Sequence, residues 1–316
     1  MLFSIVILTS FLTVSSFQLS TFGVNIRSRC RFSLKLTHVD EYEEEQVYLN
    51  QATSTDLSSE HEWVQHVRET VYEKDSILCE SQIQVVDSHL PLIVMDQFLS
   101  TEMCRIILDY ARQKDGNTLL QTSLMGVSQQ STQDRTSSTL WIDSWRRQEK
   151  QQCHSDLCYA IRTLAQKTSL LVGLPISHFE NLQVVRYLEG QQFLLHTDHL
   201  QEFNHLECRG RLATCLLYLN DSVEENDFRI SIIQKDSPTC IGGETYFPEF
   251  DTKIQPKQGR AVFFYNTIQR PGQQGYHPLM NLDVNLKARH AGSTVHKGEK
   301  WICNFWVHPV PLYNES

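Results

Sequence analysis

After Pro175 the chain consists of short apolar runs separated by glycine, proline and asparagine residues, and this pattern restricts its fold more than any other feature. The runs expected to be extended are 182–187, 193–198, 211–220, 243–250, 260–265, 291–295 and 300–308. Short strands between such turns are typical of an all-β sandwich or barrel. The polar, acidic segment 221–240 is expected to be a long loop inserted between two of these strands.

Two amphipathic helices are expected before this region. One begins after Ser100, whose hydroxyl can cap a helix, and it carries apolar residues at helical spacing up to Ala111. The other runs from Cys153 to Val172 and ends at Gly173. Helices followed by strands predict an α+β, mainly β fold, namely a double-stranded β-helix (jelly roll) core flanked by N-terminal helices.

The first 80 residues differ from the rest in composition. Residues 1–16 are almost purely apolar and are predicted to be a signal peptide, with an uncleaved membrane anchor as the less favoured alternative. Residues 17–80 are interpreted as a disordered presequence and acidic linker, leaving 81–316 as the functional domain. We therefore expect the secretory pathway (endoplasmic reticulum or Golgi), or a plastid reached through a bipartite presequence.

Charge and cysteine content exclude two further classes of function. The net charge of −9 gives no general affinity for nucleic acid. The nine cysteines form no C-x-x-C pair, so a zinc ribbon is not expected. Cys153 and Cys158 are either the ends of a short disulfide loop in a secreted protein or two residues of a helix.

The pair His196 and Asp198 indicates the chemistry of the domain. Residues two apart on a strand point to the same face, so an imidazole and a carboxylate would lie together. A second histidine would complete the 2-His-1-carboxylate site of non-haem Fe(II) oxygenases. His290 is the best candidate, since Gly292 beside it allows close backbone approach. Lys300, inside an apolar strand, calls for an anionic partner such as a carboxylate co-substrate.

Several motifs resemble the catalytic domain of the prolyl 4-hydroxylase family of 2-oxoglutarate- and Fe(II)-dependent dioxygenases. They occur in the family's order and cover about residues 82–309. The matching segments are 98–104, 135–137, 186–198, 211–219, 242–248, 256–261 and 290–308. The resemblance implies a dioxygenase that uses Fe(II), 2-oxoglutarate, O₂ and L-ascorbate and acts on a proline-containing peptide or protein.

The resemblance also implies a role for individual residues. His196, Asp198 and His290 would bind Fe(II). Lys300 would pair with the distal carboxylate of 2-oxoglutarate, Tyr187 would hydrogen-bond it, and Thr214 would line the same pocket. Arg211 and Trp306 match positions that the family places toward the peptide substrate.

Three departures from the family pattern concern the substrate and not the metal. They are Arg289, the Ser293-Thr294 pair and the 221–240 insertion. The primary hypothesis is therefore hydroxylation of peptidyl proline. The alternatives are the same chemistry on another protein residue or a small molecule, and a non-catalytic binding module that has kept the fold.

Overall fold

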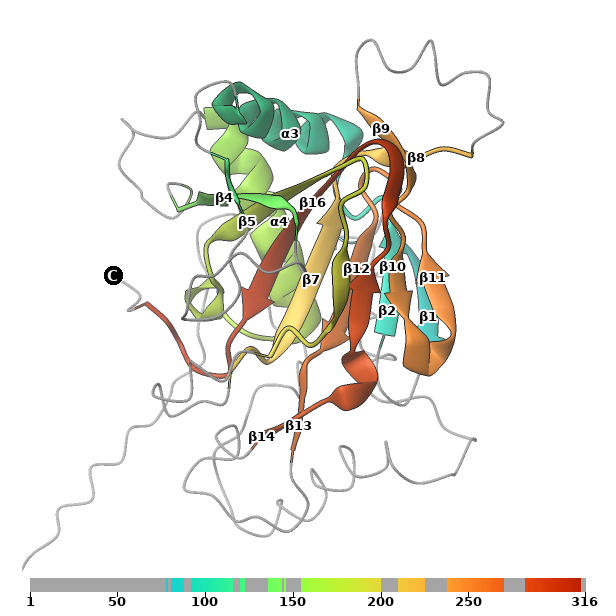
Figure 1. Ribbon diagram of the computed structural model, residues 1–316. Coiled ribbons are helices and arrows are strands. Elements are labelled where there is room, and N and C mark those ends of the chain that lie inside the picture. The colour runs from blue at the N-terminus through green and yellow to red at the C-terminus, as the bar shows by residue number, and fades with distance from the viewer. Residues whose placement is uncertain are drawn as a thin grey trace, which may run out of the picture. The chain divides into compact units, whose positions relative to one another are not determined.

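The computed structural model describes residue 78 and residues 81–87, 92–115, 120–122, 136–143, 145, 155–199, 210–224, 238–269 and 282–313. The expected signal peptide and nearly all of the expected linker lie outside these residues. The described part contains two long helices and a set of mostly short strands, many of which form two sheets (Figure 1). The prediction of a mainly β, double-stranded β-helix with flanking helices is confirmed.

The larger sheet is built around the longest strand, β16 (Val295–Val307). Within the described residues its strand order is β1-β2-β12-β7-β16-β5-β4-β3, with β9 pairing the first part of β16 and β8 pairing β9. The bounds are β1 Gln82–Asp87, β2 Leu92–Asp96, β3 Gln121–Thr122, β4 Ser138–Ile142, β5 Leu182–Leu188, β7 Ala213–Tyr218, β8 Asp221–Ser222, β9 Thr239–Gly242 and β12 Ala261–Tyr265.

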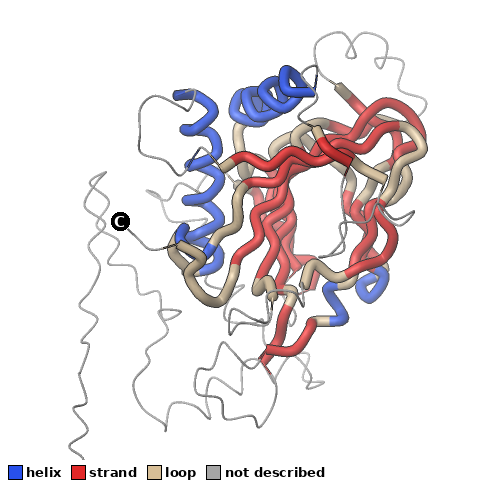
Figure 2. Tube along the Cα trace, turned by 60° about the vertical axis from the view of Figure 1, so that its left-hand side comes forward, coloured by secondary structure: helices blue, strands red, loops and turns tan. Residues whose placement is uncertain are grey.

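The smaller sheet has the order β11-β10-β15-β6. Its strands are β6 Phe193–His196, β10 Thr245–Phe247, β11 Thr252–Ile254 and β15 His290–Gly292. A separate pair joins β13 (Thr267–Gln269) to β14 (Leu282–Val284). Three short 3-10 helices complete the described elements, at Ile176–His178, Pro248–Phe250 and Leu286–Ala288. The two sheets curl toward each other, and both long helices lie on the outer side of the larger one (Figure 2).

Helix α3 (Thr101–Asp115) begins where the sequence predicts it, because Ser100 caps it. The Ser100 hydroxyl accepts a hydrogen bond from the Met103 amide at 3.3 Å, and the Ser100 carbonyl accepts one from Cys104. Helix α4 (Ser155–Val172) follows the second expected segment closely. The apolar faces of both helices cover the larger sheet in a continuous buried cluster that includes Leu164 and Phe305.

Alternation along the strands decides which residues face the space between the sheets. On β16, Trp301, Cys303 and Phe305 belong to the helix-facing cluster. The intervening residues, Lys300, Ile302, Asn304 and Trp306, therefore lie on the opposite, inner face. On β7 the same alternation turns Thr214, Leu216 and Tyr218 inward. Among the described residues, the inner face of the larger sheet therefore carries the buried Lys300. It also carries an apolar cluster that is separate from, and smaller than, the cluster under the helices.

Several details differ from the sequence-based expectations. Strand β4 and the β13–β14 pair were not expected. The large apolar residues of β4 (Leu140, Trp141 and Ile142) are consecutive and do not alternate, and β13 and β14 have only three residues each. The 221–240 segment is not wholly a loop, since its ends form the short parallel pair of β8 and β9. Residues 225–237 lie outside the described part. No helix within the described residues is both long and apolar enough to cross a membrane.

Candidate active site and metal centre

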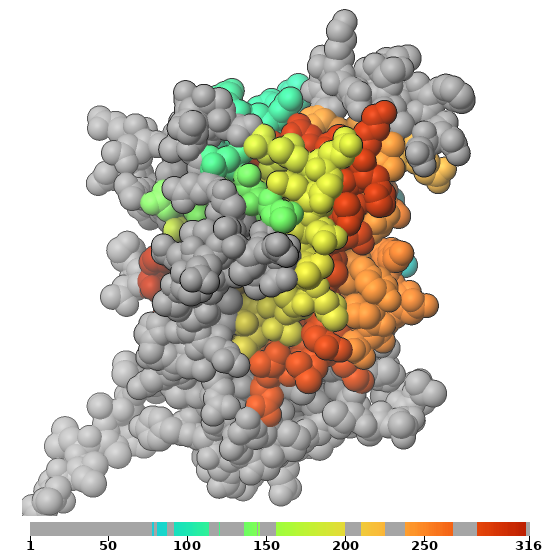
Figure 3. Space-filling view, viewed as in Figure 1, coloured from blue at the N-terminus to red at the C-terminus, as the bar shows by residue number. Residues whose placement is uncertain are grey.

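The pairing of β15 with β6 brings the two histidines together although they are far apart in sequence. In this antiparallel pair His290 lies directly opposite His196. The β5–β6 region and the C-terminal strands lie side by side on the face seen in Figure 3. The strand register thus supplies the second histidine that the sequence required from a distant segment.

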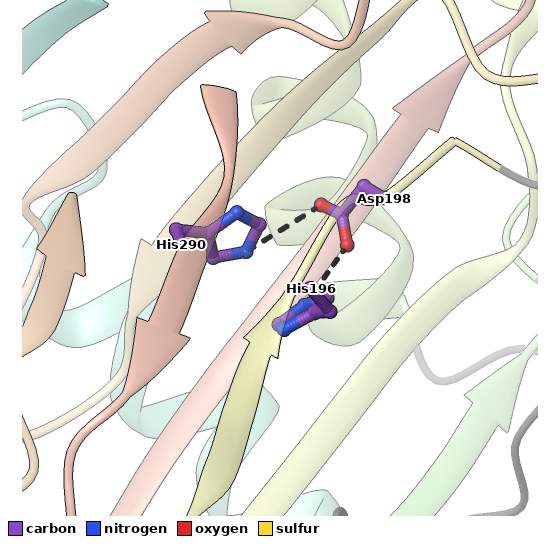
Figure 4. Close-up of side chains that lie close together, drawn as sticks. All are labelled: His196, Asp198 and His290. Carbon is purple, nitrogen blue, oxygen red and sulfur yellow. Dashed lines mark ion pairs between the residues drawn. The ribbon is translucent and has the colours of Figure 1, made fainter. Parts of the chain in front are cut away.

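His196, Asp198 and His290 form a compact cluster of possible metal ligands. One ligand atom from each lies within 4.8 Å of the other two. The Asp198 carboxylate is 3.4 Å from Nε2 of His196 and 3.9 Å from Nε2 of His290, and the side chains point toward one another from separate segments (Figure 4). The donor set and spacing fit one divalent cation held on one side, as a facial triad requires.

Both imidazoles are oriented by backbone carbonyl groups. Nδ1 of His196 lies 2.8 Å from the carbonyl oxygen of Leu194, and Nδ1 of His290 lies 3.1 Å from that of Ala288. When these Nδ1 atoms donate, each ring presents an unprotonated Nε2 toward the cluster. Phe193 stacks on His196 at a centroid distance of 3.5 Å and Phe264 packs on His290 at 4.9 Å, which restricts the rotation of both rings.

The protonation states suit a cation site. Burial raises the pKa of the Asp198 carboxyl, but the imidazoles of His290 and His196 outweigh burial and hold that pKa well below its usual range. Burial lowers the pKa of His290 to about 4. A carboxylate beside the neutral imidazole of His290 is the form in which these two side chains bind metal ions.

Asp198 is held by more than its strand. Strand β6 ends at His196, so Asp198 lies in a bend just beyond it and not in an extended run to residue 198 as expected. The Thr214 hydroxyl donates a hydrogen bond of 2.7 Å to Oδ2 of Asp198. Nδ2 of Asn266 in turn donates to the Thr214 hydroxyl at 2.8 Å. Thr214, predicted to line the co-substrate pocket, therefore has its hydroxyl directed at the Asp198 carboxylate.

Lys300 is the second main feature of the site. Its side chain is only 2% exposed, and its ammonium group makes no ion pair or hydrogen bond with any described residue. The nitrogen lies 5.3 Å from the centroid of the Tyr187 ring and 5.6 Å from that of Tyr218. Burial lowers the pKa of Lys300 to about 8. A buried ammonium without an anion is costly, so this position suits an anionic ligand.

A glycine and two hydroxyl groups shape the surroundings of Lys300. Gly243 has a φ of +75°, and a Cβ there would lie 3.1 Å from Cδ of Lys300. The Tyr218 hydroxyl donates to the Thr245 hydroxyl at 2.6 Å, and both residues are buried. Sequence reasoning missed this Tyr218–Thr245 pair. Two sequence features could have indicated it. Thr245 lies two residues after the Gly242-Gly243 pair, and Tyr218 is the last of the alternating residues of β7 that face inward.

Arg211 and Trp306, predicted to face the peptide substrate, lie together. The Arg211 guanidinium stacks on the Trp306 ring at 3.4 Å. It also forms a two-point ion pair with Glu180, at 2.6 Å through Nε and at 2.9 Å through an Nη atom. Nε2 of His308 contacts the same carboxylate at 2.8 Å. We call Glu180, Arg211 and His308 the Glu180 cluster.

The Glu180 cluster shows what sequence reasoning did not find. Glu180 precedes β5, and neither Glu180 nor His308 was among the predicted site residues. Burial raises the pKa of Glu180, but Arg211 and His308 outweigh burial and bring the pKa to about 2. The pairing of Glu180 with Arg211 spans 31 residues. The local sequence around either residue does not identify the other as its partner.

Residues 182–308 match the family model described as the 2OG-Fe(II) oxygenase superfamily. Prolyl 4-hydroxylase subunit alpha-1 of Gallus gallus is 30% identical over 179 residues, covering 55% of this chain and 27% of that protein. Prolyl 4-hydroxylase 13 of Arabidopsis thaliana is 26% identical over 230 residues, covering 67% of this chain and 69% of that protein. The viral collagen prolyl hydroxylase of Paramecium Bursaria Chlorella virus-1, solved as a 2OG complex, is 25% identical with a TM-score of 0.46, covering 69% of this chain and 96% of that one.

The chain spans about a quarter of the length of the animal alpha subunits that it matches. The match therefore covers only part of those proteins. In this chain the residues that match the family model include the triad, Lys300, Arg211 and His308, but not Glu180. The superfamily uses Fe(II), 2-oxoglutarate and O₂. Residues 182–308 are therefore similar to the 2OG-Fe(II) oxygenase superfamily, and the chain is prolyl 4-hydroxylase-like in this region.

Proposed function

We propose that the protein is a dioxygenase that hydroxylates peptidyl proline, with 2-oxoglutarate as co-substrate. The observation that carries the proposal is the buried Lys300, which forms no ion pair with a described residue and projects from the larger sheet toward the strand that carries His290. His290 belongs to the cluster with His196 and Asp198. The triad by itself would fit many metal enzymes. A buried lysine that forms no ion pair with a described residue adds a site for a dicarboxylate, which a metal centre alone does not require.

In this proposal His196, Asp198 and His290 would hold Fe(II). Bound iron would couple two oxidations by one O₂ molecule: 2-oxoglutarate loses CO₂ and becomes succinate, and a substrate C–H becomes C–OH. Lys300 pairs with the distal carboxylate of 2-oxoglutarate, and Tyr187 adds a hydrogen bond. The neighbouring aromatic rings, Phe193 and Phe264, keep water from the inner surface.

The substrate side of the site is proposed to lie at Arg211 and Trp306. Nε1 of Trp306 is buried and has no hydrogen-bond partner in the described part of the chain, so it can donate to a peptide carbonyl. Trp141, 48% exposed, packs on Trp306 at a centroid distance of 5.8 Å and extends the aromatic surface outward. Aromatic surfaces of this kind suit extended proline-containing peptides, which need little ordering on binding.

The location and the reductant are also proposals. Cys158 is disulfide-bonded, which supports an oxidising compartment such as the secretory pathway. A plastid remains the alternative. The four free cysteines in the described part, at 104, 215, 240 and 303, are buried, and burial raises their thiol pKa values, so they can persist there as thiols. The resemblance further supports L-ascorbate as the reductant that keeps iron in the ferrous state.

The test uses the purified full-length chain with Fe(II), 2-oxoglutarate, L-ascorbate and proline-rich peptides. Succinate release should require peptide, and mass spectrometry should find one added oxygen on proline. Asp198→Ala should abolish both, whereas Asp109→Ala, on the exposed side of α3, should leave them unchanged. Full turnover by Asp198→Ala would refute the metal centre. Succinate release with an oxygen added to another residue would support the dioxygenase reaction and refute proline as the target.

A further inference from the structure

The carboxylate of Asp198 lacks the support of regular secondary structure. Its strand ends two residues earlier, so no ladder hydrogen bond fixes the backbone at residue 198. The only described donor to this carboxylate besides the histidines is the Thr214 hydroxyl, which contacts Oδ2. Thr214 is itself fully buried on the inner face of β7, between two paired strands.

The direction of the hydrogen bonds follows from the chemistry of the three groups. A carboxylate only accepts, so the single hydroxyl proton of Thr214 goes to Asp198. The second contact of the hydroxyl oxygen must then come from a donor, which places Nδ2 and not Oδ1 of Asn266 at 2.8 Å. Oδ1 of Asn266 is buried and has no partner in the described part of the structure, so this single bond sets the orientation of the amide.

The backbone of Asn266 ties this chain of hydrogen bonds to both sides of the site. Its amide donates to the carbonyl of Leu212, two residues before Thr214, at 2.8 Å. Its carbonyl accepts from the amide of Asn285 at 2.8 Å. The Asn285 side chain accepts from the Lys287 amide at the start of the short helix that leads to His290. Asn266 is therefore fixed relative to both the carboxylate and the second histidine.

We propose that Asn266 is a positioning residue of the metal centre, which acts through Thr214 to fix the orientation of the Asp198 carboxylate and so strengthens binding of a divalent cation. The inference rests on the proposed metal centre but not on the identity of the substrate. Residues that orient metal ligands typically change metal affinity or activity by about 10- to 100-fold when they are replaced.

The experiment measures Co(II) binding to the metal-free full-length chain by calorimetry and by the absorption spectrum of bound Co(II). Thr214→Val removes the hydroxyl at nearly constant volume, and Asn266→Asp replaces the donor by an acceptor. Both should raise the Kd by about 10- to 100-fold and alter the Co(II) spectrum. Thr214→Ser keeps the hydroxyl and should bind as the natural protein does.

Thr267→Val is the matched control. Thr267 is also buried and adjoins Asn266, but its hydroxyl has no partner in the described part of the chain. This variant should keep the natural Kd and spectrum. If Thr214→Val does not fold, Thr214→Ala and Thr214→Ser form a second pair that differs by one hydroxyl, and only the alanine variant should bind weakly.

Two results would overturn the inference while leaving the metal centre intact. One is natural Co(II) affinity in folded Thr214→Val and Asn266→Asp. The other is an equal loss in Thr267→Val, which would indicate general loosening of the β12–β13 region. Absence of Co(II) binding by the natural protein would overturn both the metal centre and the role of Asn266.

Discussion

Two buried cations lie on the inner surface of the larger sheet, and their surroundings differ in one respect. Arg211 is 7% exposed and shares the Glu180 carboxylate with His308. Lys300 is 2% exposed and forms no ion pair with a described residue, although the charge of Glu244 also acts on it. A buried charge is tolerated when it is paired and costly when it is not. The comparison indicates that Arg211 is paired within the described part of the fold, whereas Lys300 is left for the anionic ligand that we propose.

The largest expected effect comes from breaking the pair that the fold supplies. Glu180→Gln leaves the Arg211 guanidinium buried without a carboxylate and should lower the free energy of unfolding by about 3–5 kcal/mol. Urea denaturation followed by tryptophan fluorescence measures this. Glu249→Gln is the control, because Glu249 pairs with Arg289 at 2.8 Å on the surface and should cost at most about 1 kcal/mol. Equal losses in the two variants would contradict the distinction.

Acid should weaken the same pair. The pKa of Glu180 is about 2 in the folded chain against a reference value of 4.5. Between pH 2 and pH 4.5 the folded state therefore binds fewer protons than the unfolded state. The stabilisation is therefore complete above about pH 4.5 and is lost as the pH falls toward 2. Denaturation curves across this window should show a smaller loss for Glu180→Gln than for the natural protein. An identical loss in both would assign the acid sensitivity to other carboxylates.

Removing the Lys300 ammonium group should weaken co-substrate binding without lowering the stability of the fold. Lys300→Met should weaken 2-oxoglutarate binding by about 10- to 100-fold, the value of a hydrogen bond to a charged group. It should not lower the free energy of unfolding, because it removes a buried charge that has no partner. Binding is measured by calorimetry with Mn(II) in place of Fe(II). Lys253→Met is the control, since Lys253 also lies near a tyrosine ring, at 5.7 Å from Tyr246, but is exposed.

The affinity for 2-oxoglutarate should also depend on pH through Lys300. Its pKa in the folded protein is about 8, so the ammonium loses its proton above that pH and the Kd should rise by up to about tenfold per pH unit. Without co-substrate the lowered pKa has the reverse effect on stability, which should increase between pH 8 and 10.5. Calorimetry from pH 7 to about 9 tests this, and Lys300→Met should show no such dependence. A flat profile for the natural protein would be inconsistent with Lys300 as the anion partner.

The smallest expected effect concerns Tyr187, which faces Lys300 across the β5–β16 pair. Tyr187→Phe removes one neutral hydroxyl and should raise the KM for 2-oxoglutarate by about fivefold, which corresponds to about 1 kcal/mol. The half-buried Tyr246 serves as control through Tyr246→Phe, which should leave the KM unchanged. A change as large as that of Lys300→Met would mean that Tyr187 does more than add one hydrogen bond.

Much of the site could be predicted from local sequence because strand alternation is a local property. Placing Lys300 and Trp306 on one face needs only the period of two along a single strand. The capped start of α3 at Ser100 is equally local. The position of Asp198 shows the limit of this reasoning. The two-residue spacing from His196 gave the correct grouping, but the strand ends before Asp198 and the Thr214 hydroxyl holds the carboxylate.

The sequence by itself determined the chemical groups, the strand faces and the family resemblance, since all three depend on residue identity and near neighbours. The tertiary structure alone decided which charges are paired. Glu180 meets His308 across 128 positions and Asn266 meets Thr214 across 52, and no local pattern encodes either contact. Hydrogen bonds and ion pairs act over a few ångströms of space, so they follow strand register and packing and not distance along the chain.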